Sequence, residues 1–174
     1  GPKVEKNWGR KLNLKERRLA RNSALTATTS VTTVSARGHR FSEEISALPI
    51  ILGNYSEVRD GKTEEFSIET FNHGSATRKV LAIFNEIGLG DDLNRARDGR
   101  NIRAGKATMR GRVHKTPKSI LLVVKEKSGL AQAARNLPGV DVVAARDLCA
   151  EDLAPGGAIG RLTVFTKDAV EALN

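Results

Sequence analysis

The last third of the chain carries three predominantly apolar runs separated by segments long enough to form helices. These runs are Ile120 to Val124, Val140 to Ala145 and Leu162 to Phe165. A strand with one face in water alternates apolar and polar residues, so continuous runs predict strands that are buried on both faces. The fifteen residues 125–139 suit a helical crossover between parallel strands. The pattern predicts a three-layer α/β sandwich with a mostly parallel sheet.

The first half of the chain supplies less regular elements. A helix should begin near Asn13, weaken in the β-branched run Thr28 to Val34 and end there. Leu48 to Leu52 is typical of another short buried strand. Residues 53–74 have the composition of an irregular, acidic surface excursion. These elements extend the predicted sandwich but do not fix its strand order.

Basic charge is concentrated in two short segments. The chain has 29 Lys and Arg against 20 Asp and Glu, a net charge of +9. Residues 1–21 hold eight basic and two acidic side chains, and residues 95–118 hold nine and one. Such concentration indicates a polyanionic partner rather than a general bias toward solubility. We therefore expect a basic extended arm over residues 1–12 and one α/β domain over residues 13–174 with a basic loop at 95–118.

The basic loop is the main candidate for nucleic-acid contact. It contains three glycines and no sustained period from which a packed helix or strand could be built. Glycines let a backbone approach a ligand, and Arg and Lys contact phosphates. The alternative is a solvated charged loop, but nine basic groups beside one acidic group repel one another unless something neutralises them. The candidate RNA-binding residues here are Arg95, Arg97, Arg100, Arg103, Lys106, Arg110, Arg112, His114, Lys115 and Lys118.

Two further segments could contact RNA. In the arm, Trp8 lies between Lys6 and Arg10, and its indole could stack on a base or pack on the domain's own surface. In the turn Arg37 to Phe41, the candidates are Arg37, His39 and Arg40, which could hold a phosphate or belong to a plain connecting turn. Both pairs of alternatives remain open from the sequence.

Several classes of protein are excluded or disfavoured. No run of 18 apolar residues is present, so no segment is expected to span a membrane, and no apolar region of a signal peptide is visible. The single cysteine, Cys149, cannot form an internal disulfide, which suits the cytoplasm, and its apolar neighbours favour a buried structural thiol. With 4% aromatic residues, the chain is poorly equipped to bind single strands by stacking.

The alternating strands and helices also suit a different class, a nucleotide-binding enzyme on a doubly wound α/β sheet. The P-loop spacing fails at both Gly61-Lys62 and Gly105-Lys106, because neither has a glycine five residues before the pair. The glycines at 156–160 precede a strand, where a tight turn is expected rather than a phosphate loop. The three histidines lie in separate segments without metal-ligand spacing. We therefore expect no catalytic residues, metal, cofactor or small-molecule substrate.

Several strings of the sequence together resemble one family, the large-subunit ribosomal protein L-four in its archaeal and eukaryotic form. The resemblance covers nearly the whole chain in order, except for residues 53–74. The strings are KERRLARNSALTAT at 15–28, RGHRF at 37–41, RAGKATMRGR at 103–112, KTPKS at 115–119, AARNLPGVDVV at 133–143 and LAPGGAIGRLTVFT at 153–166.

The resemblance implies a Rossmann-like α/β domain and a structural role in the large ribosomal subunit. It implies binding to large-subunit rRNA, contacts with neighbouring ribosomal proteins, a location on cytoplasmic ribosomes, and neither catalysis nor a cofactor. The family also has an N-terminal strand and a long tunnel loop, which we expect this chain to lack. The basic signature of the family falls on Arg103, Lys106, Arg110, Arg112, Lys115 and Lys118.

Overall fold

The computed structural model describes residues 1–53, 55–59, 62–66, 68–70 and 76–173. Its central sheet has four parallel strands in the order β1-β8-β6-β7. The strands are β1 (Ile50–Leu52), β6 (Leu121–Val124), β7 (Asp141–Ala144) and β8 (Thr163–Thr166). All four fall within the apolar runs or one residue beyond them, so the prediction of a parallel α/β sandwich is confirmed.

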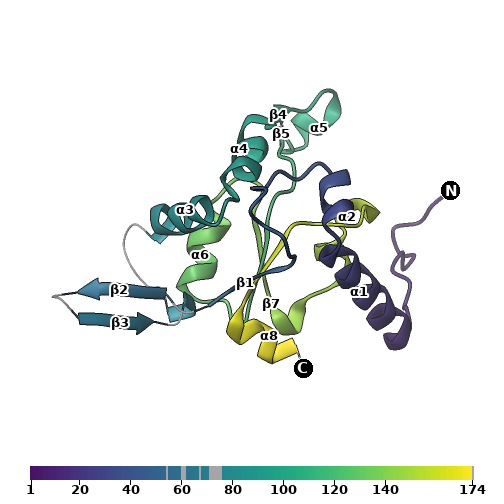
Figure 1. Ribbon diagram of the computed structural model, residues 1–174. Coiled ribbons are helices and arrows are strands. Elements are labelled where there is room, and N and C mark those ends of the chain that lie inside the picture. The colour runs from purple at the N-terminus through teal and green to yellow at the C-terminus, as the bar shows by residue number, and fades with distance from the viewer. Residues whose placement is uncertain (54, 60–61, 67, 71–75, 174) are drawn as a thin grey trace.

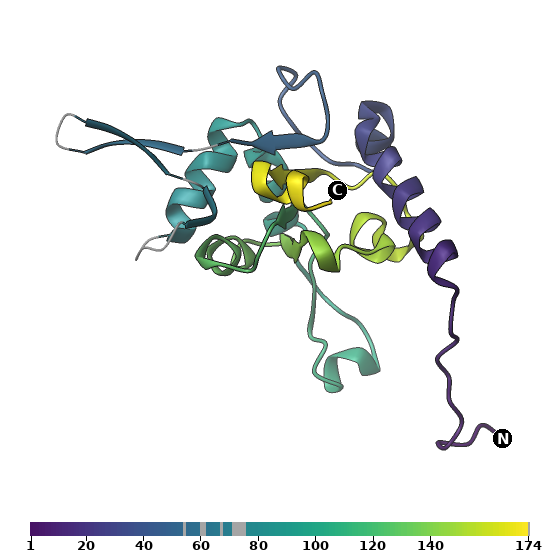
Figure 2. The ribbon, with the colours of Figure 1, turned by 90° about the horizontal axis from the view of Figure 1, so that it is seen from below.

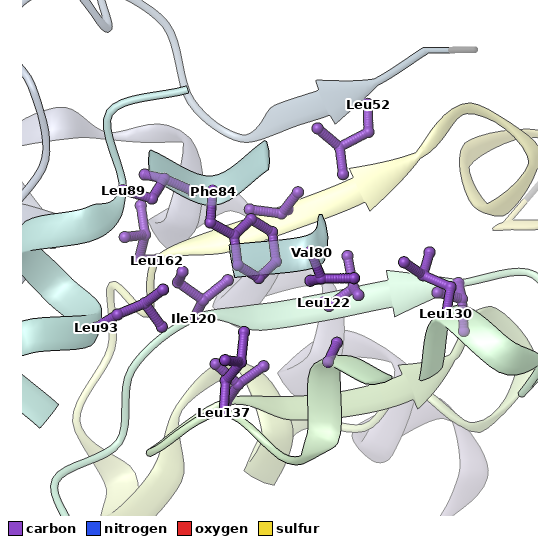
Figure 3. Close-up of a cluster of buried hydrophobic side chains, with 14 of the residues drawn as sticks. Leu52, Val80, Phe84, Leu89, Leu93, Ile120, Leu122, Leu130, Leu137 and Leu162 are labelled. Atoms are coloured by element: carbon purple, nitrogen blue, oxygen red, sulfur yellow. The ribbon is translucent and has the colours of Figure 1, made fainter. Parts of the chain in front are cut away.

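The two middle strands are buried on both faces. On one face, Leu122 of β6 and Val164 of β8 belong to a core that also contains Val80 and Phe84 (Figure 3). On the other face, Val123 and Phe165 join a second core. Because successive strand residues point to opposite faces, a continuous apolar run fills both cores. A fully buried Leu or Val side chain contributes about 2 kcal/mol to this packing.

Helices cover both faces of the sheet. The first core receives α3 (Ala76–Glu86), α4 (Gly90–Asp98) and α6 (Gly129–Arg135), and the second receives α1 (Leu14–Thr29), α7 (Ala150–Leu153) and α8 (Lys167–Leu173). Figure 1 shows α3 and α6 on one side of the sheet and α1 on the other. No helix in the described ranges is long and apolar enough to cross a membrane. Three 3₁₀ turns complete the body: η1 (Ile68–Thr70), η2 (Ala145–Asp147) and η3 (Pro155–Gly157).

The helical segment at the start of the chain continues further than expected. α1 ends at Thr29, inside the β-branched run, but α2 (Val31–Ala36) begins after the single extended residue Ser30. The Thr33 hydroxyl donates to the carbonyl oxygens of Ala27 (2.5 Å) and Ser30 (2.8 Å). A side chain thus satisfies carbonyls at the break. The prediction that the first helix ends within the β-branched run is correct, but a second short helix follows it.

The segment expected to be irregular contains a regular hairpin. β2 (Tyr55–Arg59) and β3 (Lys62–Phe66) pair in antiparallel register from Tyr55 opposite Phe66 to Arg59 opposite Lys62. This hairpin projects sideways from the body (Figure 1). The prediction of irregular structure was wrong for these two strands. Residues 54, 60, 61, 67 and 71–75 of the same segment lie outside the described residues.

Candidate nucleic-acid interface

Residues 99–117 form a projecting hairpin, which we call the cationic hairpin. It leaves the body after α4 and returns before β6, and it contains β4 (Asn101–Ile102), α5 (Lys106–Met109) and β5 (His114–Lys115). β4 and β5 pair Asn101 with Lys115 and Ile102 with His114. The expectation of no helix or strand in the basic loop was therefore wrong. Since α4 takes up residues 90–98, the true projection is also shorter than the expected loop.

Hydrogen bonds within the cationic hairpin give it a defined shape. The Arg103 N–H donates to the Val113 carbonyl oxygen over 2.8 Å, next to the short strand pair. Nearer the tip, the Thr108 hydroxyl donates to the Arg103 carbonyl oxygen over 2.6 Å. The Arg112 N–H reaches back to the Ala107 carbonyl oxygen over 3.1 Å. The cations of the hairpin are therefore held on a folded element.

Six cations extend along the cationic hairpin without an acidic residue among them. All six side chains are exposed, and within the described residues none of them forms an ion pair. Their charges are neutralised by ions from solution, which a nucleic acid can displace. They are Arg100, Arg103, Lys106, Arg110, Arg112 and Lys115.

The other three cations of the segment 95–118 pair with carboxylates. Arg95 Nε lies 2.9 Å from Asp92 Oδ1, Arg97 Nε 3.2 Å from Asp98 Oδ1, and Lys118 Nζ 2.8 Å from Asp141 Oδ2. Arg95 also donates to the Lys118 carbonyl oxygen over 2.8 Å. Arg95 thus makes structural contacts within the body, whereas the Arg97 and Lys118 pairs lie at the surface.

The arm carries its three candidates into solvent. Trp8 is 67% exposed, and the Lys6 ammonium lies 5.4 Å from its ring centroid. Arg10 is also exposed. Figure 2 shows the arm and the cationic hairpin extending from the same side of the body. Of the two alternatives for Trp8, packing on the domain's own surface does not occur here.

The turn at residues 37–41 makes mostly internal contacts. Arg37 donates to the carbonyl oxygens of Pro155 (3.1 Å) and Ala158. Burial lowers the pKa of Arg37, and the charges of Arg161 and Arg95 lower it further. His39 is 6% exposed, and its Nδ1 lies 3.1 Å from both carboxylate oxygens of Asp92. We correct the prediction for His39, since a buried ring cannot reach RNA in this structure; Arg40 remains exposed.

Three buried polar residues that hold the base of the interface were not recognised in the sequence. Asp92 has no exposed surface, and the Ser119 hydroxyl donates to it over 2.6 Å. Arg161 is 1% exposed and donates to Asp141 over 2.6 Å and to the carbonyl oxygens of Ser119 and Asp152. Their partners lie 20 or more residues away in most cases, so no local spacing marks them.

The glycine-rich turn and the cysteine, which could suggest a phosphate site or a reactive thiol, lie outside the cationic hairpin. The glycines at 156–160 form a tight turn entering β8, as predicted, with positive φ at Gly156, Gly157 and Gly160. Cys149 is exposed, with its Sγ 3.0 Å from Asp152 Oδ2, so the prediction of a buried thiol was wrong. Within the described ranges, no group of three or more His, Cys, Asp or Glu residues could hold a metal ion.

Fold and interface together define the class: an α/β sandwich protein with two projecting cationic extensions. Within that class, the chain belongs to the ribosomal protein L4/L1 family, whose model matches residues 1–174. It is 45% identical over 172 residues to the large ribosomal subunit protein uL4 of Methanocaldococcus jannaschii, covering 99% of this chain. The uL4 proteins of Thermoplasma acidophilum and Halorubrum lacusprofundi are 42% and 41% identical, over 99% and 98% of this chain. The chain spans 62%, 61% and 61% of the lengths of these three relatives.

Proposed function

We propose that this chain is a structural component of the large ribosomal subunit that binds rRNA and holds RNA helices together during translation. The observation that carries the proposal is the set of six exposed cations on the cationic hairpin, none of which forms an ion pair with a described residue. The names of the relatives, large ribosomal subunit protein uL4, supply the identity of the polyanion. The proposed location is the cytoplasmic ribosome, with neighbouring ribosomal proteins as further partners.

The proposed mechanism is electrostatic and geometric. The hairpin and the arm extend from one side of the body, so they can reach separate RNA segments at once (Figure 2). Arg binds phosphates bidentately, and each phosphate contact releases condensed counterions. Neutralising phosphates of adjacent helices removes their mutual repulsion and holds them together. No chemical step by the chain is needed.

Of the predicted RNA-binding residues, we retain those whose side chains are exposed and do not pair with a carboxylate among the described residues. Arg97 and Lys118 are exposed but peripheral, because each is paired with a carboxylate. His114 is exposed as well and is left out of the retained set because it carries no permanent positive charge. The proposed contacts are Lys6, Trp8, Arg10, Arg40, Arg100, Arg103, Lys106, Arg110, Arg112 and Lys115.

Charge reversal in the cationic hairpin tests the proposal. The triple variant Arg103→Glu, Arg110→Glu, Arg112→Glu should lose co-sedimentation with the large subunit in a gradient while its circular dichroism is unchanged. The matched control reverses Lys125, Lys127 and Lys167, which follow the carboxyl ends of β6 and β8, whereas the hairpin enters β6 at its amino end. The control should still co-sediment.

Two results would contradict the proposal. One is retention of the hairpin variant on the large subunit, and the other is equal loss by both triple variants. Specific binding of ATP or NAD by the chain would instead support the nucleotide-binding enzyme that strand and helix alternation also allows.

A further inference from the structure

Asp92 lies where three segments of the chain meet. It sits in the first turn of α4 and has no exposed surface. Its carboxylate accepts hydrogen bonds from the Arg40 backbone N–H (3.0 Å), from Arg95 Nε (2.9 Å) and from the Ser119 hydroxyl (2.6 Å). His39 Nδ1 lies at 3.1 Å. One carboxylate therefore joins the 37–41 turn, the helix that precedes the cationic hairpin and the chain that follows it.

Arg95 extends this junction to the returning end of the hairpin. The same guanidinium that donates to Asp92 donates through Nη2 to the Lys118 carbonyl oxygen over 2.8 Å. Gly99, where the hairpin begins, lies only four positions after Arg95 in the chain. Both ends of the hairpin are thus held by one ion pair, in which Asp92 is fully buried and Arg95 is partly exposed.

The backbone is also closely packed at the base of the hairpin. A Cβ atom on Gly99 would lie 2.7 Å from Pro117 Cγ, and one on Gly139 would lie 2.5 Å from the Pro117 carbonyl oxygen. The Ser119 N–H also donates to the Gly139 carbonyl oxygen over 2.8 Å. The returning chain is therefore enclosed between the end of α4 and the segment that enters β7.

Burying a carboxylate costs desolvation free energy. What it provides in return is a set of hydrogen bonds with fixed directions. Burial alone would raise the pKa of Asp92, but hydrogen bonds from His39, Arg95 and Ser119 outweigh it, and the pKa lies far below its ordinary value. Well-packed apolar residues often stabilise a core as well as a buried ion pair does. Hydrogen bonds with fixed directions, unlike apolar contacts, set the angle between the segments that they join.

We propose that Asp92, acting with Ser119 and Arg95, is a positioning residue that fixes the direction of the cationic hairpin for binding to folded RNA. The inference rests on the proposed function. A folded RNA presents its phosphates at fixed positions, so an element held in the right direction loses little conformational entropy on binding. A flexible single strand adjusts to the hairpin in any direction. Asp92 therefore affects the first kind of binding and not the second.

The test compares two neighbouring carboxylates. Asp92→Asn and Asp91→Asn add the same charge to the same helical turn, but Asp91 is exposed and takes no part in the junction. Ser119→Ala weakens the junction without changing any charge. Affinities would be measured by fluorescence anisotropy at one salt concentration, for a Mg²⁺-folded large-subunit rRNA transcript of Methanocaldococcus jannaschii and for poly(U).

We expect Asp92→Asn to change the affinity for the folded transcript in the direction opposite to the one that its change in net charge alone would give. The added positive charge should strengthen binding to both RNAs slightly, as in Asp91→Asn. We expect Asp92→Asn instead to weaken binding to the folded transcript about tenfold, with Ser119→Ala in the same direction, and neither to weaken binding to poly(U).

The affinities for the two RNAs distinguish failure of the positioning role from failure of the proposed function. Equal affinities of Asp92→Asn and Asp91→Asn for the folded transcript would overturn the positioning role, as would a parallel loss for both RNAs. Should Asp92→Asn fail to fold, Ser119→Ala decides by the same comparison with the unmodified chain. If the unmodified chain does not prefer the folded transcript to poly(U), it is the proposed function that fails.

Discussion

Arg161 places a guanidinium in the interior, where it donates to three carbonyl oxygens and one carboxylate. That carboxylate, Asp141, also binds the Lys118 ammonium at 2.8 Å. The three residues lie at or just before the amino ends of β8, β7 and β6. A single aspartate therefore ties together the starts of three neighbouring strands.

Removing the charge of Asp141 should destabilise the chain in a pH-dependent way. Burial alone would raise the pKa of Asp141, but hydrogen bonds from Lys118 and Arg161 lower it below its ordinary value. Its contribution to stability is therefore complete above about pH 4 and is lost as the pH falls through the folded-state pKa. We expect Asp141→Asn to lower the free energy of unfolding by about 2 kcal/mol at pH 7, because the buried Arg161 loses its counterion. Urea titrations at pH 7 and pH 3 should show the gap from the unmodified chain narrowing.

The control for this prediction is Asp98→Asn. Asp98 is 71% exposed and pairs with the exposed Arg97. An exposed pair contributes less than about 1 kcal/mol. A gap for Asp141→Asn that stays constant down to pH 3 would show that its charge is not what stabilises the strand ends.

Among the elements, the turn at residues 155–160 packs closely against the first half of the chain. Gly160 has φ of +81°, and a Cβ atom there would lie 2.6 Å from the Thr33 carbonyl oxygen. Gly157 has nearly the same φ, +80°, but a Cβ atom there would meet nothing within 4 Å. The two positions differ in close approach and not in backbone conformation.

These glycines allow backbone strain and steric contact to be separated. We expect Gly157→Ala to cost about 1 to 2 kcal/mol of unfolding free energy, the cost of a left-handed conformation for a residue with a Cβ. Gly160→Ala should cost at least about 2 kcal/mol more, because the α2 backbone must move. Equal costs in urea unfolding experiments would contradict the contact with Thr33.

The elements that the sequence predicted well are those whose pattern is local. The runs at 120–124, 140–145 and 162–165 each contain a strand, because a run that is mostly apolar on both strand faces favours burial between two layers. Asp141 and Thr163 are the polar residues within these runs. The β2–β3 hairpin was missed because its charged composition hides the antiparallel pairing.

In the candidate site, the exposed cations of the cationic hairpin could be located from charge density alone. His39 could not be separated from them, because its partner Asp92 is 53 residues away in the sequence. Arg95 could have been separated, because Asp92 lies three residues before it on the same helix.

On the scale of the whole molecule, cations and carboxylates are arranged so that the projections stay charged. Within the described residues, ion pairs lie in the body, and the cationic hairpin has none. Figure 2 shows the hairpin extending away from the body. Under the proposed function, the RNA would meet positive charge that the protein has not already neutralised.

This arrangement predicts the salt dependence of RNA binding. If the six cations of the cationic hairpin each engage a phosphate, a plot of log affinity against log salt concentration should have a slope of about −4 to −5. Replacing Arg103, Arg110 and Arg112 by Gln should reduce the slope to about −2 to −3, since three contacts are lost. The same replacement at Lys125, Lys127 and Lys167 should leave it unchanged. A slope near zero for the unmodified chain would exclude counterion release as the source of affinity.

The cationic hairpin gives no side chain to either hydrophobic core. The two hydrophobic cores therefore do not depend on the hairpin side chains for their packing. The packing of the α/β body consequently does not depend on how many cationic side chains the hairpin carries. Substitutions at the tip can accordingly retune affinity for a different RNA surface without a new solution to the folding problem.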